Sequence, residues 1–298
     1  MKLLRNAPSR ALSAHSGAAP GRLVVEPLVR AALLEDLAHG GDLTTDAIVP
    51  RDLQATAKIG ARADGVIAGL DAALLAFELL EPGATKTDVH VADGCAVARG
   101  DVVAEIRGAA WVLLTGERTT LNLLCRLSGI ATATRTLVDA VAGTRANVVD
   151  TRKTTPGLRV LEKYAVRCGG GHNHRFGLDD AVLIKDNHLA LAGSIREAVA
   201  RARERAGHMV KIEVEVERLD QLREALREPI DAVLLDNMDT PTLAEAVRIV
   251  GGAVITEASG GIRPETIAAV AATGVDLISV GWLTHSAPSL DLGLDIAL

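Results

Sequence analysis

After Gly143, short apolar segments alternate with amphipathic helical segments, and this rhythm constrains the fold more than any other feature of the chain. The candidate strands are NVVDTRK, AVLIKD, VKIEVEV, DAVLLDN, AVITEAS and VDLISVG. Between several of them lie the candidate helices GSIREAVARARERAG, TPTLAEAVRIVGG and RPETIAAVAATG. Continuous apolar strands that alternate with helices are typical of a parallel sheet covered by helices. Because no GxGxxG follows the first strand, the pattern favours a closed α/β barrel over a dinucleotide-binding sheet.

The residues before Gly143 have a different organisation. We expect an amphipathic helix from Glu26 to about Gly40, and a small α+β layer with a partly antiparallel sheet over 53–110. One helix is expected near 71–80, and a long helix between Gly116 and Gly143 whose apolar face carries Leu121, Leu124, Leu127 and Ile130. The expected divisions are a disordered basic extension at 1–22, an α/β sandwich domain at 23–142, an α/β barrel at 143–285, and a segment at 286–298 that packs back on the sandwich domain.

Composition excludes several classes of protein. The formal net charge of −6 and the aromatic content of 2% argue against a nucleic-acid binder. No uncharged apolar run is long enough to span a membrane. The three cysteines, Cys95, Cys125 and Cys168, form no CxxC motif and are odd in number, which favours a reducing, cytoplasmic location. The basic segment before residue 23 is interpreted as a frayed extension rather than a targeting signal. It contains Pro8, Gly17 and Pro20 and has no continuous apolar run.

Polar residues gather where the predicted barrel strands end, at the edge that forms the active site of α/β barrels. They are Thr151, Arg152 and Lys153; Lys185 and Asp186; Glu213, Glu215 and Glu217; and Asp236 and Asn237. Because strand side chains alternate, the three glutamates share one face. This concentration of charge predicts a polar active site, although a buried ion-pair network with no function is the alternative.

Two further strand ends carry glycine. Ser259, Gly260 and Gly261 precede a helix that begins at Pro264, and Val280, Gly281 and Trp282 follow the last strand. Free backbone amides at a helix N-terminus bind phosphate well, and barrels often hold a phosphate between their last two strand loops. We therefore expect a phosphate site here, with simple tight turns as the alternative.

Cations surround the same edge: Arg152, Lys153, His172, His174, Arg175 and Lys185. Such a group needs acidic partners or a polyanionic ligand. His172 and His174 could be a metal pair, but no third His or Cys ligand is evident, so contact with an anion or a role in the loop is favoured. Cys168 could be a nucleophile, but a small residue before a glycine turn is the favoured interpretation. Glu215 and Asp236 could either balance the cations or hold a hydrated Mg²⁺.

These segments resemble the quinolinate phosphoribosyltransferase family. The resemblance rests on DTRKTTPGLRVLEKYAVRCGGGHNHRFGL, LIKDNH, EVEVE, LLDNM, EASGGI and VGWLTHSAPSLDLGLDI, and it extends upstream through GERTTLNLLCRLSGIAT to cover about residues 26–298. It implies an irregular, incomplete α/β barrel with an N-terminal open-faced α/β sandwich. It also implies a pentosyltransferase of NAD biosynthesis that converts quinolinate and phosphoribosyl pyrophosphate to nicotinate mononucleotide, pyrophosphate and CO₂ with Mg²⁺.

The resemblance also implies roles for individual residues. Those expected around the quinolinate carboxylates are Arg118, Arg152, His174, Arg175 and Lys185. Those expected to bind phosphoribosyl pyrophosphate and its metal are Lys153, Glu215, Asp236, Ser259, Gly260, Gly261 and Gly281, with Thr151, Val280 and Trp282 beside them. Lys153, Lys185, Glu215 and Asp236 are the expected catalytic residues, with Mg²⁺ bound through the phosphoribosyl pyrophosphate and through Glu215 and Asp236. The family further implies a homodimer in which Arg118 enters the neighbouring subunit's site.

Two other functions remain open at this point. One is that of molybdenum-associated homologues, which share the barrel and act on another substrate. The other is non-catalytic binding of phosphorylated metabolites, for which Glu215 and Asp236 would not be needed opposite the cations.

Overall fold

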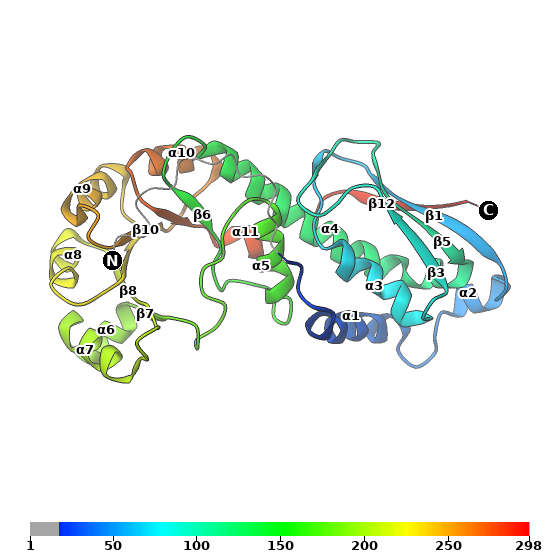
Figure 1. Ribbon diagram of the computed structural model, residues 1–298, viewed down its shortest axis with the longest axis horizontal. Coiled ribbons are helices and arrows are strands. Elements are labelled where there is room, and N and C mark those ends of the chain that lie inside the picture. The colour runs from blue at the N-terminus through cyan, green and yellow to red at the C-terminus, as the bar shows by residue number, and fades with distance from the viewer. Residues whose placement is uncertain (1–17, 298) are drawn as a thin grey trace. The chain divides into compact units, whose positions relative to one another are not determined.

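The computed structural model describes residues 18–297, which form two compact units (Figure 1). The barrel unit comprises Thr136–Lys153 and Gly171–Trp282. The sandwich unit comprises the described residues through Arg135, then Thr154–Gly170 and residues 283–297. The expected barrel segment, 143–285, is therefore interrupted by Thr154–Gly170. Residues 1–17 of the expected extension lie outside the described residues.

The barrel unit is a six-stranded parallel sheet with strand order β6-β11-β10-β9-β8-β7. Its strands are β6 (Asn147–Val149), β7 (Val182–Ile184), β8 (Ile212–Val216), β9 (Ala232–Asp236), β10 (Ile255–Ser259) and β11 (Leu277–Ser279). Its helices are α6 (Asp186–Ala192), α7 (Ile195–Arg205), α8 (Leu219–Ala225), α9 (Thr240–Val250) and α10 (Pro264–Ala272). Each of the helices α7 to α10 has buried apolar residues, and they include Val199, Leu222, Leu243 and Ile267 respectively. The six predicted strands are thus confirmed.

The sheet does not close, so the prediction of a closed barrel is wrong and the incomplete barrel is confirmed. Strands β6 and β7 are the two edges and do not pair with each other. The chain between them is long and contains α5 (Arg159–Cys168), which belongs to the sandwich unit. The outer edge of β6 instead forms one parallel bridge, in which His172 lies beside Val149. The open edge thereby receives the His172–Arg175 segment, which carries two of the predicted site residues.

The sandwich unit is built on an antiparallel sheet with strand order β12-β1-β5-β3. Its strands are β1 (Gln54–Ala61), β3 (Thr85–Val89), β5 (Val102–Ala109) and β12 (Leu292–Ala297), with a separate pair formed by β2 (Gly65–Val66) and β4 (Ala96–Val97). Its helices are α1 (Arg22–Leu37), α2 (Leu43–Ile48), α3 (Leu70–Leu80), α5, and most of α4 (Ala110–Ala140) and α11 (Trp282–His285). The final segment of the chain lies in this sheet because β12 pairs with β1.

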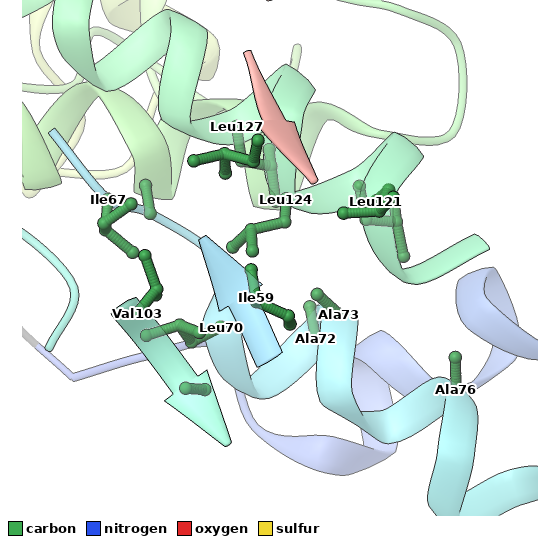
Figure 2. Close-up of a cluster of buried hydrophobic side chains, with 14 of the residues drawn as sticks. Ile59, Ile67, Leu70, Ala72, Ala73, Ala76, Val103, Leu121, Leu124 and Leu127 are labelled. Atoms are coloured by element: carbon green, nitrogen blue, oxygen red, sulfur yellow. The ribbon is translucent and has the colours of Figure 1, made fainter. Parts of the chain in front are cut away.

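Helices α3 and α4 form one core with the inner face of this sheet. The predicted apolar face of α4 is confirmed, since Leu121, Leu124, Leu127 and Ile130 are all buried. Figure 2 shows three of these leucines beside Ile59 of β1 and the alanines of α3. The small alanine side chains allow the helices to approach closely, which suits a chain with so few aromatic residues.

The other face of the sheet is open and charged. Lys58 of β1 lies opposite Glu105 of β5 in the register, and their charged atoms are 3.6 Å apart. Arg107 extends this row by pairing with Asp88 at 3.5 Å and with Glu105. Strand alternation puts these charges on one side and Ala57, Ile59 and Ile106 on the other, which is what makes the sandwich open-faced.

Three predicted helix boundaries, in two helices, differ from the structure. Helix α1 begins at Arg22 rather than Glu26, and it ends at Leu37, where Ala38 takes a positive φ, before the expected stop at Gly40. Helix α4 begins at Ala110, so Gly116 lies inside the helix rather than before it. A Cβ on Gly116 would come within 2.6 Å of the Phe77 ring, so this glycine serves close helix packing and not chain reversal. Among the described residues, no helix has the length and apolarity needed to cross a membrane.

Candidate active site

The parallel sheet of the barrel unit brings most of the predicted site residues to one edge. Parallel strands end at the same edge, and there the structure has Thr151, Arg152 and Lys153 after β6, Lys185 after β7, Glu215 on β8, Asp236 on β9, Ser259, Gly260 and Gly261 at the end of β10, and Val280, Gly281 and Trp282 after β11. Arg118 is the exception. It is exposed on α4 in the sandwich unit, and its side chain makes no hydrogen bond to another described residue.

The loops after β6 and β11 touch because these strands are neighbours. A Cβ on Gly281 would lie 2.8 Å from Cδ of Lys153, so the absence of a side chain at Gly281 leaves room for the lysine side chain to pass. The Lys153 amide donates to Oγ1 of Thr151 at 3.0 Å, which fixes the turn that carries the lysine. The Val280 amide donates to the Val149 carbonyl at 3.0 Å, and Nε1 of Trp282 donates to the Ile262 carbonyl at 3.0 Å. These contacts connect three successive loops of the site edge.

Lys185 and Glu215 form an ion pair across neighbouring strands. Nζ of Lys185 is 2.8 Å from Oε2 of Glu215. The lysine side chain is 45% exposed and the glutamate 11%, so the ammonium faces solvent and can reach an incoming anion. The carboxylate therefore holds the lysine at the site edge.

The ends of β9 and β10 interlock through Asn237 and Gly260. Nδ2 of Asn237 donates to Oδ2 of Asp236 at 2.6 Å, and Asn237 itself has a positive φ of 53°. A Cβ on Gly260 would lie 2.1 Å from Oδ1 of Asn237, and the φ of Gly260 is 99°, so only glycine fits here. Gly261, by contrast, has nothing within 4 Å of its Cβ position. It leaves the approach to the N-terminus of α10 open, as a phosphate site requires.

The segment that follows the His172 bridge is anchored by a buried acid. Asp150 is fully buried and accepts hydrogen bonds from Nδ2 of Asn173 at 2.6 Å and from the His174 amide at 2.9 Å. These hydrogen bonds fix the backbone position from which the His174 and Arg175 side chains extend. Sequence reasoning did not select Asp150 as a site residue. Its role as an anchor arises because the loop that carries Asn173 and His174 returns to the edge of β6.

His174 lies against two buried glutamates. Its Nε2 is 3.1 Å from Oε2 of Glu213 and 3.5 Å from Oε2 of Glu257. Burial, followed by the charge of Glu213, raises the pKa of Glu257 to about 8. Sequence reasoning did not select Glu257, although an acid inside the apolar strand segment AVITEAS was a usable signal.

Two arginines stand near this cluster. Burial and the neighbouring charge of Arg152 lower the pKa of Arg175, and Nη1 of Arg175 donates to the Ala181 carbonyl at 3.0 Å. Nε of Arg152 is buried and makes no hydrogen bond within the described residues. An anion between the two guanidinium groups would relieve their mutual repulsion.

The donor sets for a cation differ in chemistry. Glu215 and Asp236 offer carboxylate oxygens at the site edge, which suits Mg²⁺ that also binds a substrate phosphate. A histidine pair of His172 and His174 does not form in the described residues, where the one His–carboxylate group within metal-binding reach consists of His174, Glu213 and Glu257. Cys168 is 2% exposed, and burial raises the pKa of its thiol to about 12, so it is a core residue and not a nucleophile.

Comparison with known proteins identifies relatives over nearly the whole chain. The family model described as "Quinolinate phosphoribosyl transferase, N-terminal domain" matches residues 42–128, and the one for the C-terminal domain matches residues 130–295. A "Probable nicotinate-nucleotide pyrophosphorylase [carboxylating]" of Bacillus subtilis is 47% identical over 276 residues, which are 93% of this chain and 94% of the relative. The enzyme of that name from Mycobacterium leprae is 48% identical over 272 residues, covering 90% of this chain and 95% of the relative.

Solved structures agree with the sequence relatives. The crystal structure of NadC from Streptococcus pyogenes is similar with a TM-score of 0.91 and 40% identity, covering 94% of this chain and 99% of that one. The nicotinate-nucleotide pyrophosphorylase from Francisella tularensis gives a TM-score of 0.89 and 39% identity, with 95% and 99% coverage. With both family models matched and relatives this similar over nine-tenths of its length, the chain belongs to the quinolinate phosphoribosyltransferase family.

Proposed function

We propose that this chain is the phosphoribosyltransferase that converts quinolinate and phosphoribosyl pyrophosphate to nicotinate mononucleotide, pyrophosphate and CO₂ in NAD biosynthesis. The relatives carry the name of this reaction. The observation that carries the proposal is one edge of a parallel sheet where Arg152, Arg175 and Lys185 stand opposite Glu215 and Asp236. Two anionic substrates need the cations, and a reaction through a cationic ribosyl centre needs the acids.

Quinolinate is a dianion, and we assign its two carboxylates to Arg152, Arg175 and Lys185, with His174 beside them. The paired guanidiniums and the exposed Nζ of Lys185 support this assignment. The ring nitrogen attacks C1 of the ribose as pyrophosphate leaves. The adjacent carboxylate then departs as CO₂, and its bonding electrons stay on the ring carbon, which takes up a proton. The new pyridinium nitrogen stabilises that carbanion, so no further cofactor is needed.

Phosphoribosyl pyrophosphate is assigned to the other half of the edge. The open approach at Gly261 supports a phosphate at the start of α10, with Ser259, Gly260, Gly281, Thr151, Val280 and Trp282 lining it. Lys153 lies across Gly281 and would stabilise the departing pyrophosphate. Mg²⁺ fits Glu215 and Asp236, and when bound it would neutralise the charge of the leaving group.

The working assembly in this proposal is a homodimer. Arg118 is exposed and its side chain makes no hydrogen bond to another described residue, and it is the one assigned site residue outside the barrel unit. An arginine supplied by the partner subunit would close the anionic site at an interface that both copies share by symmetry. We also infer a cytoplasmic location, which the three free cysteines support.

The test is a comparison of substrates with purified protein, phosphoribosyl pyrophosphate and Mg²⁺. We expect quinolinate, and not nicotinate, to drive pyrophosphate release, and EDTA to stop the reaction. Release driven by another pyridine, or binding of both ligands without release, would instead favour a homologue with a different substrate or a non-catalytic binder.

A further inference from the structure

No substrate contact is assigned to the buried pair of Glu213 and Glu257, yet both carboxylates lie within 3.5 Å of Nε2 of His174. Glu213 and Glu215 are two residues apart on β8, so their side chains lie on the same face of the sheet. Glu215 and Glu257 are both in register with Leu234 of β9, so Glu257 shares that face. Glu257 is 1% exposed and Glu213 is 8% exposed. Both carboxylate oxygens of Glu257 and Oε1 of Glu213 make no hydrogen bond within the described residues.

The hydrogen bonds of the His174 ring define its tautomer. Its Nδ1 accepts from the Arg175 amide at 2.7 Å, so Nδ1 carries a lone pair and no hydrogen. A neutral ring then carries its hydrogen on Nε2, where it points at Oε2 of Glu213 at 3.1 Å. In this arrangement His174 is not an imidazolium. It therefore supplies no positive charge to balance the two buried acids.

A metal ion does not resolve the imbalance either. Nε2 is the ring atom that lies against the carboxylates, and a protonated nitrogen cannot be a ligand. Two adjacent buried carboxylates with a neutral histidine are costly unless one of them is protonated. Glu257 is the more deeply buried of the two and has no hydrogen-bonded partner.

We propose that Glu257 is a positioning residue that holds a proton beneath His174, which keeps the ring neutral and keeps the floor of the quinolinate site from gaining a second buried negative charge. When Glu257 loses this proton, the added charge repels the quinolinate dianion. Affinity for quinolinate then falls at alkaline pH while the chemical steps are unchanged. This inference rests on the proposed function for its substrate, but the protonation state can be measured without any substrate.

The groups that surround Glu257 favour its protonated form. Glu213 faces it from β8, His174 faces it from the loop that bridges to β6, and Asp150 lies at the end of β6. Its register partners on β9 and β11, Leu234 and Leu277, are apolar. Burial, followed by the charge of Glu213, raises the pKa of Glu257 to about 8.

The kinetic test compares wild type with Glu257→Gln, which imitates the protonated acid. Glu204→Gln is the matched control, because Glu204 is exposed on α7. We expect the wild-type KM for quinolinate to rise about fivefold or more between pH 7 and pH 9.5, with kcat little changed. Glu257→Gln should have a wild-type KM at pH 7 and lose this rise, whereas Glu204→Gln should keep it. An equal rise in all three proteins would overturn the proposal.

The substrate-free test is ¹⁵N NMR of the ring nitrogens of His174, assigned with His174→Gln. We expect the neutral form with hydrogen on Nε2 at pH 7 in wild type and in Glu257→Gln. An imidazolium at pH 7, or Zn²⁺ binding that Glu257→Gln abolishes, would overturn the proposal even if Glu257→Gln folds poorly. If wild type shows the neutral ring but no turnover of quinolinate, the proposed function fails and the protonation assignment stands.

Discussion

Adjacent glycines after β10 both have a positive φ but differ in the space around their Cβ positions, and this difference can be tested at the scale of single residues. Gly260→Ala should destabilise the protein, because its Cβ would meet Asn237 at 2.1 Å and its φ is 99°. Gly261→Val has an open Cβ position, but a φ of 62° strains a β-branched side chain, so this variant should lose some stability and also raise the KM for phosphoribosyl pyrophosphate by blocking the approach to the backbone amides. Thermal melts and kinetics of the two variants check this. A normal KM in a folded Gly261→Val protein would move the phosphate site elsewhere.

Glu257 also makes stability depend on pH. Its pKa rises from an ordinary 4.5 to about 8 on folding because the side chain is buried, so between these values the folded state binds a proton that the unfolded state has released. This stabilising contribution is complete below about pH 4.5 and is lost as the pH rises through about 8. Glu257→Gln should therefore gain stability over wild type as pH increases, by about 1–3 kcal/mol at pH 8.5.

Denaturation midpoints of both proteins from pH 5 to 9 measure this effect, with Glu204→Gln as the control. A constant difference between wild type and Glu257→Gln across the range would show that Glu257 does not titrate between the two states.

At the scale of elements, α4 and α5 are joined by one buried ion pair. Glu162 of α5 is 0% exposed and accepts from Nη2 of Arg126 on α4 at 2.9 Å, and from the amide and Oγ1 of Thr155 at 3.0 and 2.8 Å. Arg126→Ala should cost about 3–5 kcal/mol, because it leaves a buried carboxylate without its cation. Arg201→Ala, which breaks an exposed pair with Glu197, should cost less than about 0.5 kcal/mol.

Calorimetric unfolding of these variants distinguishes the two effects. Glu162→Gln added to Arg126→Ala should recover part of the loss, since it removes the stranded charge. A similar small loss in Arg126→Ala and Arg201→Ala would contradict the role of the buried pair.

The elements that sequence predicted well are those with strong internal patterns. Apolar runs identified every strand of the barrel unit, and the 3.6-residue period identified α3, α7, α9 and α10. Closure of the sheet could not be read in this way, because it depends on whether β6 and β7 pair across a long connection. The pattern was equally silent about α5, whose buried residues include Glu162 and Lys163 as well as apolar ones.

The residues of the candidate site also differ in how well the sequence predicts them. Residues at strand ends, such as Lys185 and Asp236, were predictable because the topology collects them at one edge. Glu257 and Asp150 were not selected, because their importance comes from burial against His174 and its loop rather than from position along a strand.

At the scale of the whole molecule, the proposed dimer predicts complementation between subunits. Arg118→Ala and Lys185→Ala homodimers should each be nearly inactive, because every site in either homodimer carries a lesion. A mixed dimer puts both lesions in one site and leaves the other complete, so it should recover up to about half the wild-type activity. Co-expression with two different affinity tags isolates the mixed dimer for assay. Inactive mixed dimers would show that Arg118 acts in its own subunit.

The central claim is that the cations and acids at the edge of the barrel sheet carry out a coupled transfer and decarboxylation. The most direct measurement follows quinolinate labelled with ¹⁴C in the carboxylate next to the ring nitrogen, incubated with the protein, phosphoribosyl pyrophosphate and Mg²⁺. The account predicts labelled CO₂ and nicotinate mononucleotide in equal amounts, both abolished in Lys185→Ala. Consumption of neither substrate by folded wild-type protein, or CO₂ release without nucleotide, would contradict it.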